Sequence, residues 1–269
     1  MRRLPFALAA LIAFTGLPAL AHEFWISPQT YTVQPGDQLV ADIRVGQTFK
    51  GGAYSYIPGN IVRFDLVMGD DVIPVEGRIG DRPALGMTAP AEGLVTVVHQ
   101  TTDSFLTYKE AEKFVQFVEH KDFDGVLEEH KARGLPEVGF RERYSRFGKS
   151  LIAVGDGAGA DRAVGMETEI VALANPYTDD LSGGMPVRVL YQGQPRVDVQ
   201  VEVYARDGAL PVEVTTYRTD ARGEAVIPVE PGIEYLFDAV VMRPLEPQAE
   251  DDPVWESLWA SLTFMVPER

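Results

Sequence analysis

Hydrophobic and polar residues alternate along the chain downstream of residue 30. In one such segment Leu39, Ile43 and Val45 fall on the same face. Alternation with a period of two predicts strands that have one buried face. We expect these strands, separated by turns rich in Pro, Gly and Asp, at residues 31–33, 38–45, 61–68 and 94–99. Together they predict an antiparallel β domain.

The period changes to that of a helix within residues 109–133. Phe114, Phe117 and Val118 recur at helical spacing, and a second group with this spacing covers residues 123–130. Apolar residues three and four positions apart lie on one face of a helix. The sequence therefore predicts two short helices inserted into the β domain.

A segment rich in Gly and Asp, residues 155–161, separates two patterned regions. Such a segment favours solvated turns. We therefore predict a linker at 155–165, between an N-terminal domain at 22–154 and a C-terminal domain at 166–269. The segment 141–154 fits a helix and a strand equally well, and the sequence leaves this choice open.

Beyond the linker, seven short runs again have the pattern of strands. Seven strands in about 100 residues are typical of a β-sandwich. We therefore predict a mainly β protein with two antiparallel β domains, of which the second is an Ig-like sandwich and the first carries the helical insertion. The predicted strands of the second domain are 168–174, 186–191, 197–204, 213–218, 224–229, 235–242 and 261–266.

The spacing of the apolar residues near the C-terminus is helical. Trp255, Leu258, Trp259 and Leu262 stand at positions i, i+3, i+4 and i+7. This spacing predicts a short amphipathic helical turn that closes the core.

Charge and cysteine content exclude several classes of partner and chemistry. The chain has 40 acidic and 24 basic residues, a formal net charge of −16 and a pI near 4.6. Phosphate groups are bound by clusters of Lys and Arg, so this charge excludes nucleic acid and anionic lipid as partners. Since the chain has no cysteine, disulfides, thiolate metal sites and cysteine nucleophiles are excluded as well.

The first 21 residues have the pattern of a cleavable secretory signal. Arg2 and Arg3 precede an apolar run at 4–14, and residues 19–21 read Ala-Leu-Ala, as cleavage requires. The run is shorter than the ~20 residues of a membrane-spanning helix. We expect a signal peptide at 1–21, no membrane insertion after its cleavage, and a periplasmic location for a secreted chain without cysteine.

The sequence holds no motif that predicts catalysis. There is no nucleophile elbow with a Ser-His-Asp order, no phosphate-binding loop and no H-E-x-x-H. We therefore expect a protein that is not an enzyme.

The sharpest chemical feature is His22, which cleavage would leave as the first residue. A free α-amine beside its own imidazole forms a chelate, and a second histidine completes a site suited to copper(II) or nickel(II). His99 is the first choice for this partner because it ends a predicted strand. Glu23 would complete a site for nickel or cobalt. The alternative is that His22 is incidental, since cleavage leaves some residue first in every secreted protein.

The other two histidines have structural interpretations. His120 lies near the end of the first predicted helix, where the helix dipole favours a protonated side chain. His130 lies on the apolar face of the second, which is typical of a core histidine.

Motifs from several parts of the chain resemble those of one protein family. They are His22 to Trp25, Lys113-Phe114, the segment 141–149, Asn-Pro-Tyr at 175–177 and the segment 255–264. On these motifs the chain resembles a periplasmic domain-of-unknown-function family formerly described as a nickel-uptake (NikM-like) component. The resemblance implies the periplasm, metal handling and an envelope transport partner. One departure is Ala-Val-Val-Met at 239–242, which lacks a histidine of that family and so removes one candidate ligand.

A second resemblance concerns the C-terminal part. Residues 193–201, 219–223 and 231–235 resemble prealbumin-like and carboxypeptidase-regulatory-like sandwich modules, in which a Thr-Asp-x-x-Gly turn joins two strands. Asp220 can cap this turn and Gly223 can take a positive φ.

Two functional hypotheses follow. The first is a periplasmic accessory protein that binds nickel, cobalt or copper with His22 as its anchor. The second is a structural or protein-interaction β-sandwich protein of the envelope that binds no metal. Metal content of the processed protein would separate them.

Overall fold

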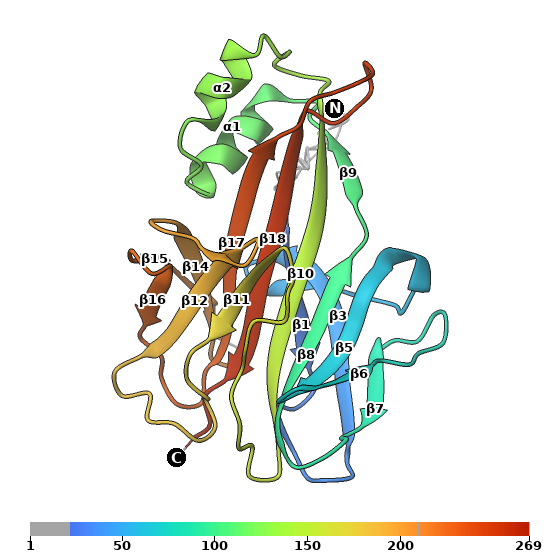
Figure 1. Cartoon of the computed structure of the whole chain (residues 1–269), viewed down its shortest axis with the longest axis vertical. Coiled ribbons are helices and arrows are strands. Elements are labelled where there is room, and N and C mark those ends of the chain that lie inside the picture. Colours follow the sequence, from blue (N-terminus) through green and yellow to red (C-terminus); the bar gives the residue numbers. More distant parts are fainter. Residues whose placement is uncertain (1–21, 209, 269) are drawn as a thin grey trace, which may run out of the picture.

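The computed structural model of the chain describes residues 22–208 and 210–268. Strands dominate it, and two short helices lie at one end (Figure 1). The prediction of a mainly β fold with a short helical insertion is thereby confirmed. No helix in the described ranges is long and apolar enough to cross a membrane. The predicted signal peptide, 1–21, lies outside them.

The largest sheet has ten strands and forms the centre of the molecule. Two of its strands, β2 (Thr32–Val33) and β9 (Ser104–Thr107), pair with β10 beside the main path. The order along the main path is β15 (Glu213–Arg218), β14 (Gln200–Arg206), β17 (Glu234–Pro244), β18 (Trp255–Met265), β10 (Arg141–Val154), β8 (Gly93–Thr101), β5 (Ile61–Met68) and β6 (Asp71–Pro74).

Two four-stranded sheets accompany this central sheet. The first belongs to the N-terminal part and the second to the C-terminal part. The first contains β1 (Glu23–Pro28), β3 (Gln38–Gln47), β4 (Lys50–Tyr54) and β7 (Leu85–Thr88). The second contains β11 (Thr168–Ala172), β12 (Met185–Tyr191), β13 (Gln194–Pro195) and β16 (Glu224–Ile227). A 3₁₀ helix, η1 (Pro58–Asn60), precedes β5.

The ten-stranded sheet crosses the predicted domain boundary. β10 and β18 pair in parallel, from Glu142 opposite Trp255 to Ser150 opposite Thr263. Strands from both predicted domains therefore share one sheet, contrary to the prediction of two separate antiparallel β domains. Nearly every residue of β18 is buried, and a strand with both faces covered belongs in the middle of a sheet.

Two local expectations are resolved by the same pairing. Residues 255–262 are part of strand β18, so the predicted amphipathic turn is wrong. Helical spacing misleads here because both faces of β18 are buried, so its apolar residues do not alternate strictly and Trp255, Leu258, Trp259 and Leu262 fall at helical spacing by coincidence. The undecided segment 141–154 is strand β10.

Two hydrophobic cores lie beside the central sheet. One is built from the N-terminal part and includes Phe24 and Leu66. The other is built mainly from the C-terminal part and includes Val187, but it also takes in Leu94 and Leu151. The cores are distinct while the sheet is shared, so the predicted domain bounds stay a prediction.

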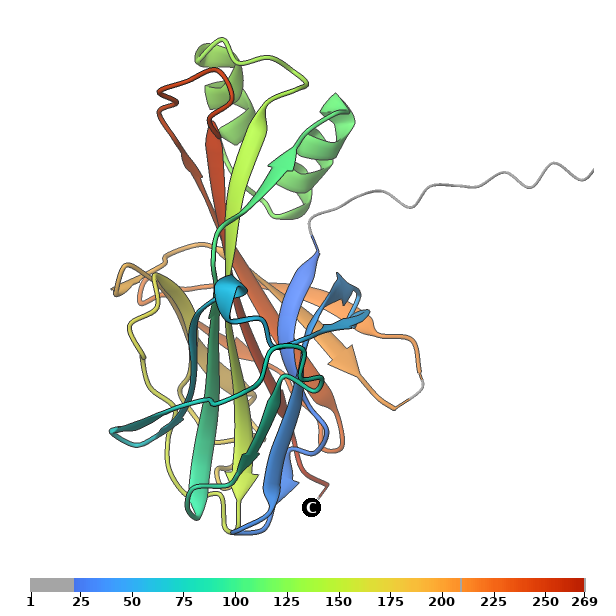
Figure 2. The same ribbon diagram turned by 90° about the vertical axis from the view of Figure 1, so that its right-hand side faces the viewer.

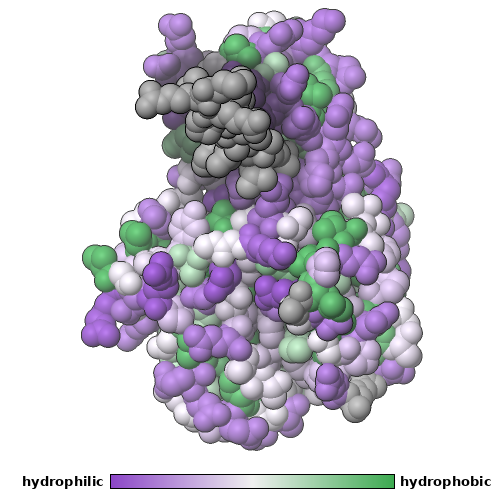
Figure 3. Space-filling model, turned by 180° about the vertical axis from the view of Figure 1, so that it is seen from behind, coloured by the Kyte–Doolittle hydropathy of each residue, from purple (hydrophilic) through white to green (hydrophobic). Residues whose placement is uncertain are grey.

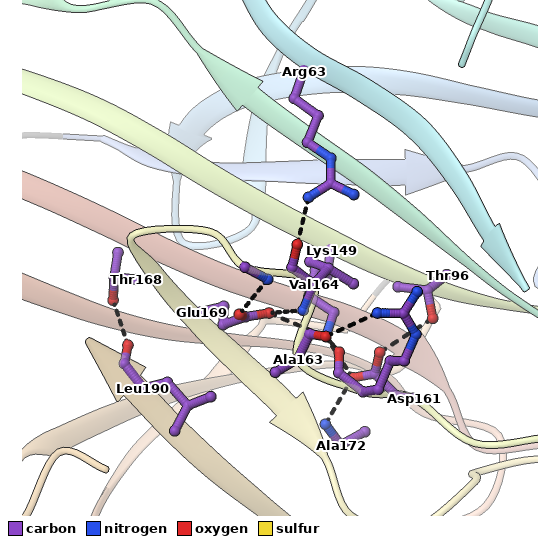
Figure 4. A network of polar contacts seen from close by, with 12 residues as sticks. Arg63, Thr96, Lys149, Asp161, Ala163, Val164, Thr168, Glu169, Ala172 and Leu190 are labelled. Carbon is purple, nitrogen blue, oxygen red and sulfur yellow. Dashed lines mark hydrogen bonds and ion pairs between the residues drawn. The ribbon is translucent and has the colours of Figure 1, made fainter. Parts of the chain in front are cut away.

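The predicted linker, 155–165, is anchored at its far end by a buried ion pair (Figure 4). The side chain of Lys149 in β10 is fully buried, and its Nζ donates to Oδ2 of Asp161 at 2.7 Å. Thr96 donates to the same carboxylate at 3.2 Å, and Glu169 lies 3.9 Å from the Lys149 ammonium. The expectation of a solvated turn is therefore wrong for this end of the segment.

The two helices, α1 (Ala111–His120) and α2 (Val126–Ala132), fall within the predicted 109–133. They cover the extended ends of β10, β17 and β18 (Figures 1 and 2). In their common core they pack against Trp255 and Trp259. Their core includes Tyr108 and Phe140 as well, so the helices pack on both the N-terminal and the C-terminal part of the chain.

The Thr-Asp-x-x-Gly turn has the predicted geometry. Oδ1 of Asp220 accepts hydrogen bonds from the backbone N–H groups of Arg222 and Glu224, at 2.8 and 3.0 Å. Gly223 has a φ of +69°. A Cβ at this position would lie 2.8 Å from Cβ of Pro195 and 2.9 Å from the backbone nitrogen of Arg196, so glycine is required there.

The described residues form a mostly hydrophilic surface on the face seen from behind (Figure 3). Hydrophobic side chains occur there in small groups among hydrophilic ones. Scattered apolar side chains are usual on a soluble surface, so this view does not point to a docking face.

Candidate functional site

β1 begins directly after His22, and its side chains alternate between two interiors. Phe24 belongs to the N-terminal core. Trp25 belongs to a separate cluster with Tyr204. Since successive side chains of a strand point to opposite faces, Glu23 lies on the side of Trp25 and not on that of Phe24.

Glu23 is buried in contact with Tyr204. The tyrosine hydroxyl lies 3.0 Å from Oε1 of Glu23 and 2.8 Å from Oε2 of Glu202. A hydroxyl carries one hydrogen, so it donates to only one of the two carboxyls. Burial raises the pKa of Glu23 to about 7. Tyr204 therefore donates either to Glu23 or to Glu202, and it can donate to Glu202 whenever Glu23 is protonated and donates to Tyr204.

A buried ammonium lies next to these carboxyls. Lys121, the residue after α1, forms ion pairs with Glu202 and, at 2.8 Å, with Asp238. Burial alone would lower the pKa of Lys121, but the two carboxylates outweigh it and raise the pKa. The ammonium thus remains charged and supplies the positive charge that this interior requires.

The two carboxyls that pair with Lys121 differ in the direction of their pKa shifts. Burial raises the pKa of Asp238, and its Oδ1 has no hydrogen-bond partner. Burial acts in the same direction on Glu202, but a hydrogen bond from His120 and the charge of Lys121 hold its pKa below the usual range. Glu202 is therefore the permanently ionised member.

The rim of this group is formed by His120, the last residue of α1. Its side chain is half exposed, and Nε2 lies 2.8 Å from Oε1 of Glu202. The hydrogen bond to Glu202 raises the pKa of His120, although partial burial opposes this. We call Glu23, His120, Lys121, Glu202, Tyr204 and Asp238 the acidic cluster.

His99 lies elsewhere. It is 2% exposed, and its ring contacts Phe24 and Phe64, with centroid distances of 5.4 and 4.9 Å. Burial lowers its pKa to about 3. Because Phe24 and Glu23 point to opposite faces of β1, His99 and Glu23 do not meet at one site.

The predicted ligand set of His22, Glu23 and His99 is therefore not assembled. His22 is half-buried at the start of β1, beside Glu23 in the chain, and His99 is packed behind Phe24. Across 22–208 and 210–268, no group of three or more His, Cys, Asp or Glu side chains could hold a metal ion. The histidine that the structure links to Glu23 is instead His120.

His130 has the environment of a core histidine. Trp255 Nε1 donates to its Nδ1 at 2.9 Å, and its Nε2 lies 3.0 Å from the carbonyl oxygen of Pro136. Nε2 therefore carries the hydrogen and donates to that carbonyl. Both ring nitrogens are satisfied within the fold, which leaves none for a ligand.

The sequence matches the description "Domain of unknown function (DUF4198)" over residues 19–243. This range covers most of the chain and includes β1 and the acidic cluster. The chain belongs to the DUF4198 family. No curated protein matches the sequence.

Solved structures offer only distant likenesses to this DUF4198 protein. The D0-D1 domain of Intimin is 13% identical, with a TM-score of 0.22, and the match covers 91% of this chain and all of that one. A tetra-tandem repeat in the extending region of a large adhesion protein is 11% identical, with a TM-score of 0.20, covering 91% of this chain and 49% of that one. At these TM-scores neither carries an argument about function.

A second buried carboxyl lies under the helices of the DUF4198 protein. Glu142 is 1% exposed, and it accepts hydrogen bonds from Ser257 and, at 2.5 Å, from Tyr108. Burial raises the pKa of Glu142 to about 7, and these hydrogen bonds offset only part of the effect. The folded protein therefore keeps this proton at pH values where the unfolded chain releases it.

We predict that Glu142→Gln reduces the pH dependence of stability. A carboxyl with a raised pKa stabilises the fold fully below its ordinary value of 4.5, and this contribution is lost as the pH rises to about 7. Relative to the variant, the wild type should lose about 3 kcal/mol of unfolding free energy over this range. Urea unfolding at several pH values measures the difference. Parallel curves for the two proteins would contradict the prediction.

Proposed function

We propose that this DUF4198 protein is a non-catalytic protein of the bacterial periplasm that binds a transition metal ion at its processed N-terminus. The observation that carries the proposal is the short connection from that terminus to a half-exposed histidine. Glu23, next to His22, contacts Tyr204, which contacts Glu202, which in turn contacts His120.

The chemistry of the terminus supports the proposal. Cleavage after residue 21 creates a free amine on His22, and this amine and its imidazole supply two nitrogens to one ion. The amine is a main-chain group, so such a chelate needs fewer side chains than a site built from side chains alone. The hydrogen-bonded connection from Glu23 leads to His120, which we assign as the third nitrogen.

Charge favours the rim of the acidic cluster over its interior. Lys121 already forms ion pairs with both Glu202 and Asp238 inside the fold, so a divalent ion there would meet a buried positive charge. At the rim, His120 is half exposed. A nitrogen-rich site of this kind suits copper(II) or nickel(II), and cobalt with an added carboxylate.

The wider role that we propose is that of an uptake or handling accessory. The resemblance to the NikM-like family, the signal-like residues 1–21 and the absence of catalytic motifs in the sequence support a periplasmic, non-enzymatic protein that passes a metal to an envelope transport partner. The acidic charge of the chain is compatible with attraction of cations.

Isothermal titration of the secreted, processed protein with copper(II) and nickel(II) tests the proposal. Mass spectrometry first establishes that the chain begins at His22. We expect one site per chain. An alanine placed before His22 should weaken binding at least about tenfold, because an amide nitrogen replaces the amine. His120→Gln should weaken binding by a similar factor, since it removes a ligand nitrogen.

His99→Phe is the matched control, because it removes a histidine that is buried on the other face of β1. It should leave metal affinity unchanged. Equal, weak binding by all four proteins would refute the proposal and support an envelope interaction protein without a metal. If only the chain extended by alanine loses binding, His22 is a ligand and His120 is not.

A further inference from the structure

A pocket lies beside β10, at the part of this strand that is between its pairing with β8 and its pairing with β9. Residues Leu151–Val154 of β10 pair with β8, and Arg141–Tyr144 pair with β9. Between them the chain leaves β8 and crosses to β9, with η1 beside the crossing (Figure 2). Arg146 lies in this gap, and its backbone N–H donates to Oγ1 of Thr101 at 3.0 Å.

The guanidinium of Arg146 lacks a carboxylate partner. Its Cζ lies 4.7 Å from the ring centroid of Tyr144, and its Nε is buried without a hydrogen-bond partner. No carboxylate in the described part of the chain forms an ion pair with it. Burial lowers the pKa of Arg146, and a hydrogen bond with Tyr144 offsets only part of this effect, because a buried cation without an ion-pair partner is unfavourable.

His99 provides a second unpartnered polar group to the same pocket. It is 2% exposed, and neither ring nitrogen has a hydrogen-bond partner. Around it the wall is apolar and includes Phe24, Ile43 and Ile61. The pocket opens at Tyr54 and Ile57, which are 54% and 43% exposed.

The volume of the pocket is about 180 Å³. An apolar cavity of roughly 150 Å³ accommodates benzene. A ligand that combines one ring, or an aliphatic group of similar size, with one small polar group therefore matches the space.

We propose that this pocket binds a small organic monocarboxylate, with Arg146 pairing to the carboxylate and the apolar group lying against Phe24 and Ile61. A guanidinium presents parallel N–H donors that match a carboxylate. The neutral ring of His99 offers a further hydrogen bond within the pocket. This site lies on the other face of β1 from Glu23, so it is independent of the proposed metal site.

The charge at the mouth is compatible with an anionic ligand. Asp103 also lines the pocket, but its carboxylate is half exposed and lies 3.7 Å from Nε of Arg143. Arg143 pairs more closely with Glu256, at 2.7 Å, so it offsets only part of the charge of Asp103. Arg146 itself forms no ion pair among the described residues, and the carboxyls of Asp238 and Glu142 influence it only from a distance.

Titration calorimetry of the processed protein with benzoate, and with its neutral analogue benzamide, tests the proposal. We expect saturable benzoate binding and benzamide binding that is at least about tenfold weaker, because a hydrogen bond between charged groups is lost. Arg146→Gln should remove the preference for benzoate. Arg44→Gln, an arginine paired with Asp42 at 2.6 Å outside the pocket, should keep it.

A rim substitution covers the case in which Arg146→Gln fails to fold. Ile57→Asp places a negative charge at the half-exposed mouth and should weaken benzoate binding several-fold. Ile79→Asp, at a position that is 81% exposed and outside the pocket, should not. In the wild type, benzoate should shift the NMR signals of the His99 ring.

The proposal is overturned if benzoate does not bind, if benzamide binds equally well, or if Ile57→Asp and Ile79→Asp behave alike. The chain extended by alanine before His22 should bind benzoate normally. This result separates the pocket from the metal site, because each can fail while the other is retained.

Discussion

Replacement of Lys121 by methionine is expected to lower the unfolding free energy by about 3–5 kcal/mol. Methionine keeps the length and apolar stem of lysine but removes the ammonium. Glu202 and Asp238 would then remain buried without their cation. Removing one partner of a buried ion pair is strongly destabilising because the remaining charge is uncompensated.

Urea unfolding at neutral pH measures this effect, with Lys131→Met as the control. Lys131 is exposed in α2, and its substitution should change stability by no more than about 0.5 kcal/mol. If charge is the cause, adding Asp238→Asn to Lys121→Met should restore part of the stability. A Lys121→Met protein as stable as the wild type would refute this interpretation of the acidic cluster.

Replacement of Lys149 by methionine should have an effect of similar size, about 3–5 kcal/mol. Its ammonium compensates Asp161 and Glu169 between the central sheet and β11 (Figure 4). Asp161 also accepts hydrogen bonds from Thr96 and from the backbone of Ala172. Loss of the ammonium should therefore release the end of the linker as well as destabilise the fold.

Two measurements separate these effects. Urea unfolding gives the loss of stability, and limited proteolysis reports whether residues 155–165 become cleavable. Lys50→Met, at an exposed position in β4, is the control for both. Unchanged stability together with an uncleaved linker would show that the ion pair does not hold this segment.

The sequence predicted the elements that have a single clear period. Alternation identified the half-buried strands β3 and β5, and helical spacing identified α1 and α2. It failed at β18, because both faces of this strand are buried and its apolar residues therefore do not follow a period of two. Pairing between β10 and β18 could not be predicted, since local pattern contains no information about which strands meet.

The candidate site was predictable only in part. Glu23 was selected, and the structure places it in the acidic cluster. Asp238 carried a signal that was overlooked, because it interrupts the apolar run of β17. The sequence around Glu202 contains no such signal, because Glu202 alternates with Val201 and Val203 and so has the pattern of a solvent-facing residue. His99 was chosen from its place at a strand end, and the side on which that strand packs depends on tertiary contacts.

The parallel pairing of β10 with β18 has a consequence for the order of folding. The whole segment 155–254 separates the two strands, so the central sheet can close only after nearly the entire chain has emerged. Contacts of such sequence separation slow folding. Until β18 arrives, one edge of β10 lacks its partner, and an open edge of this kind invites pairing with other chains. A chain with this topology therefore depends on protection of that edge until β18 is available to pair with it.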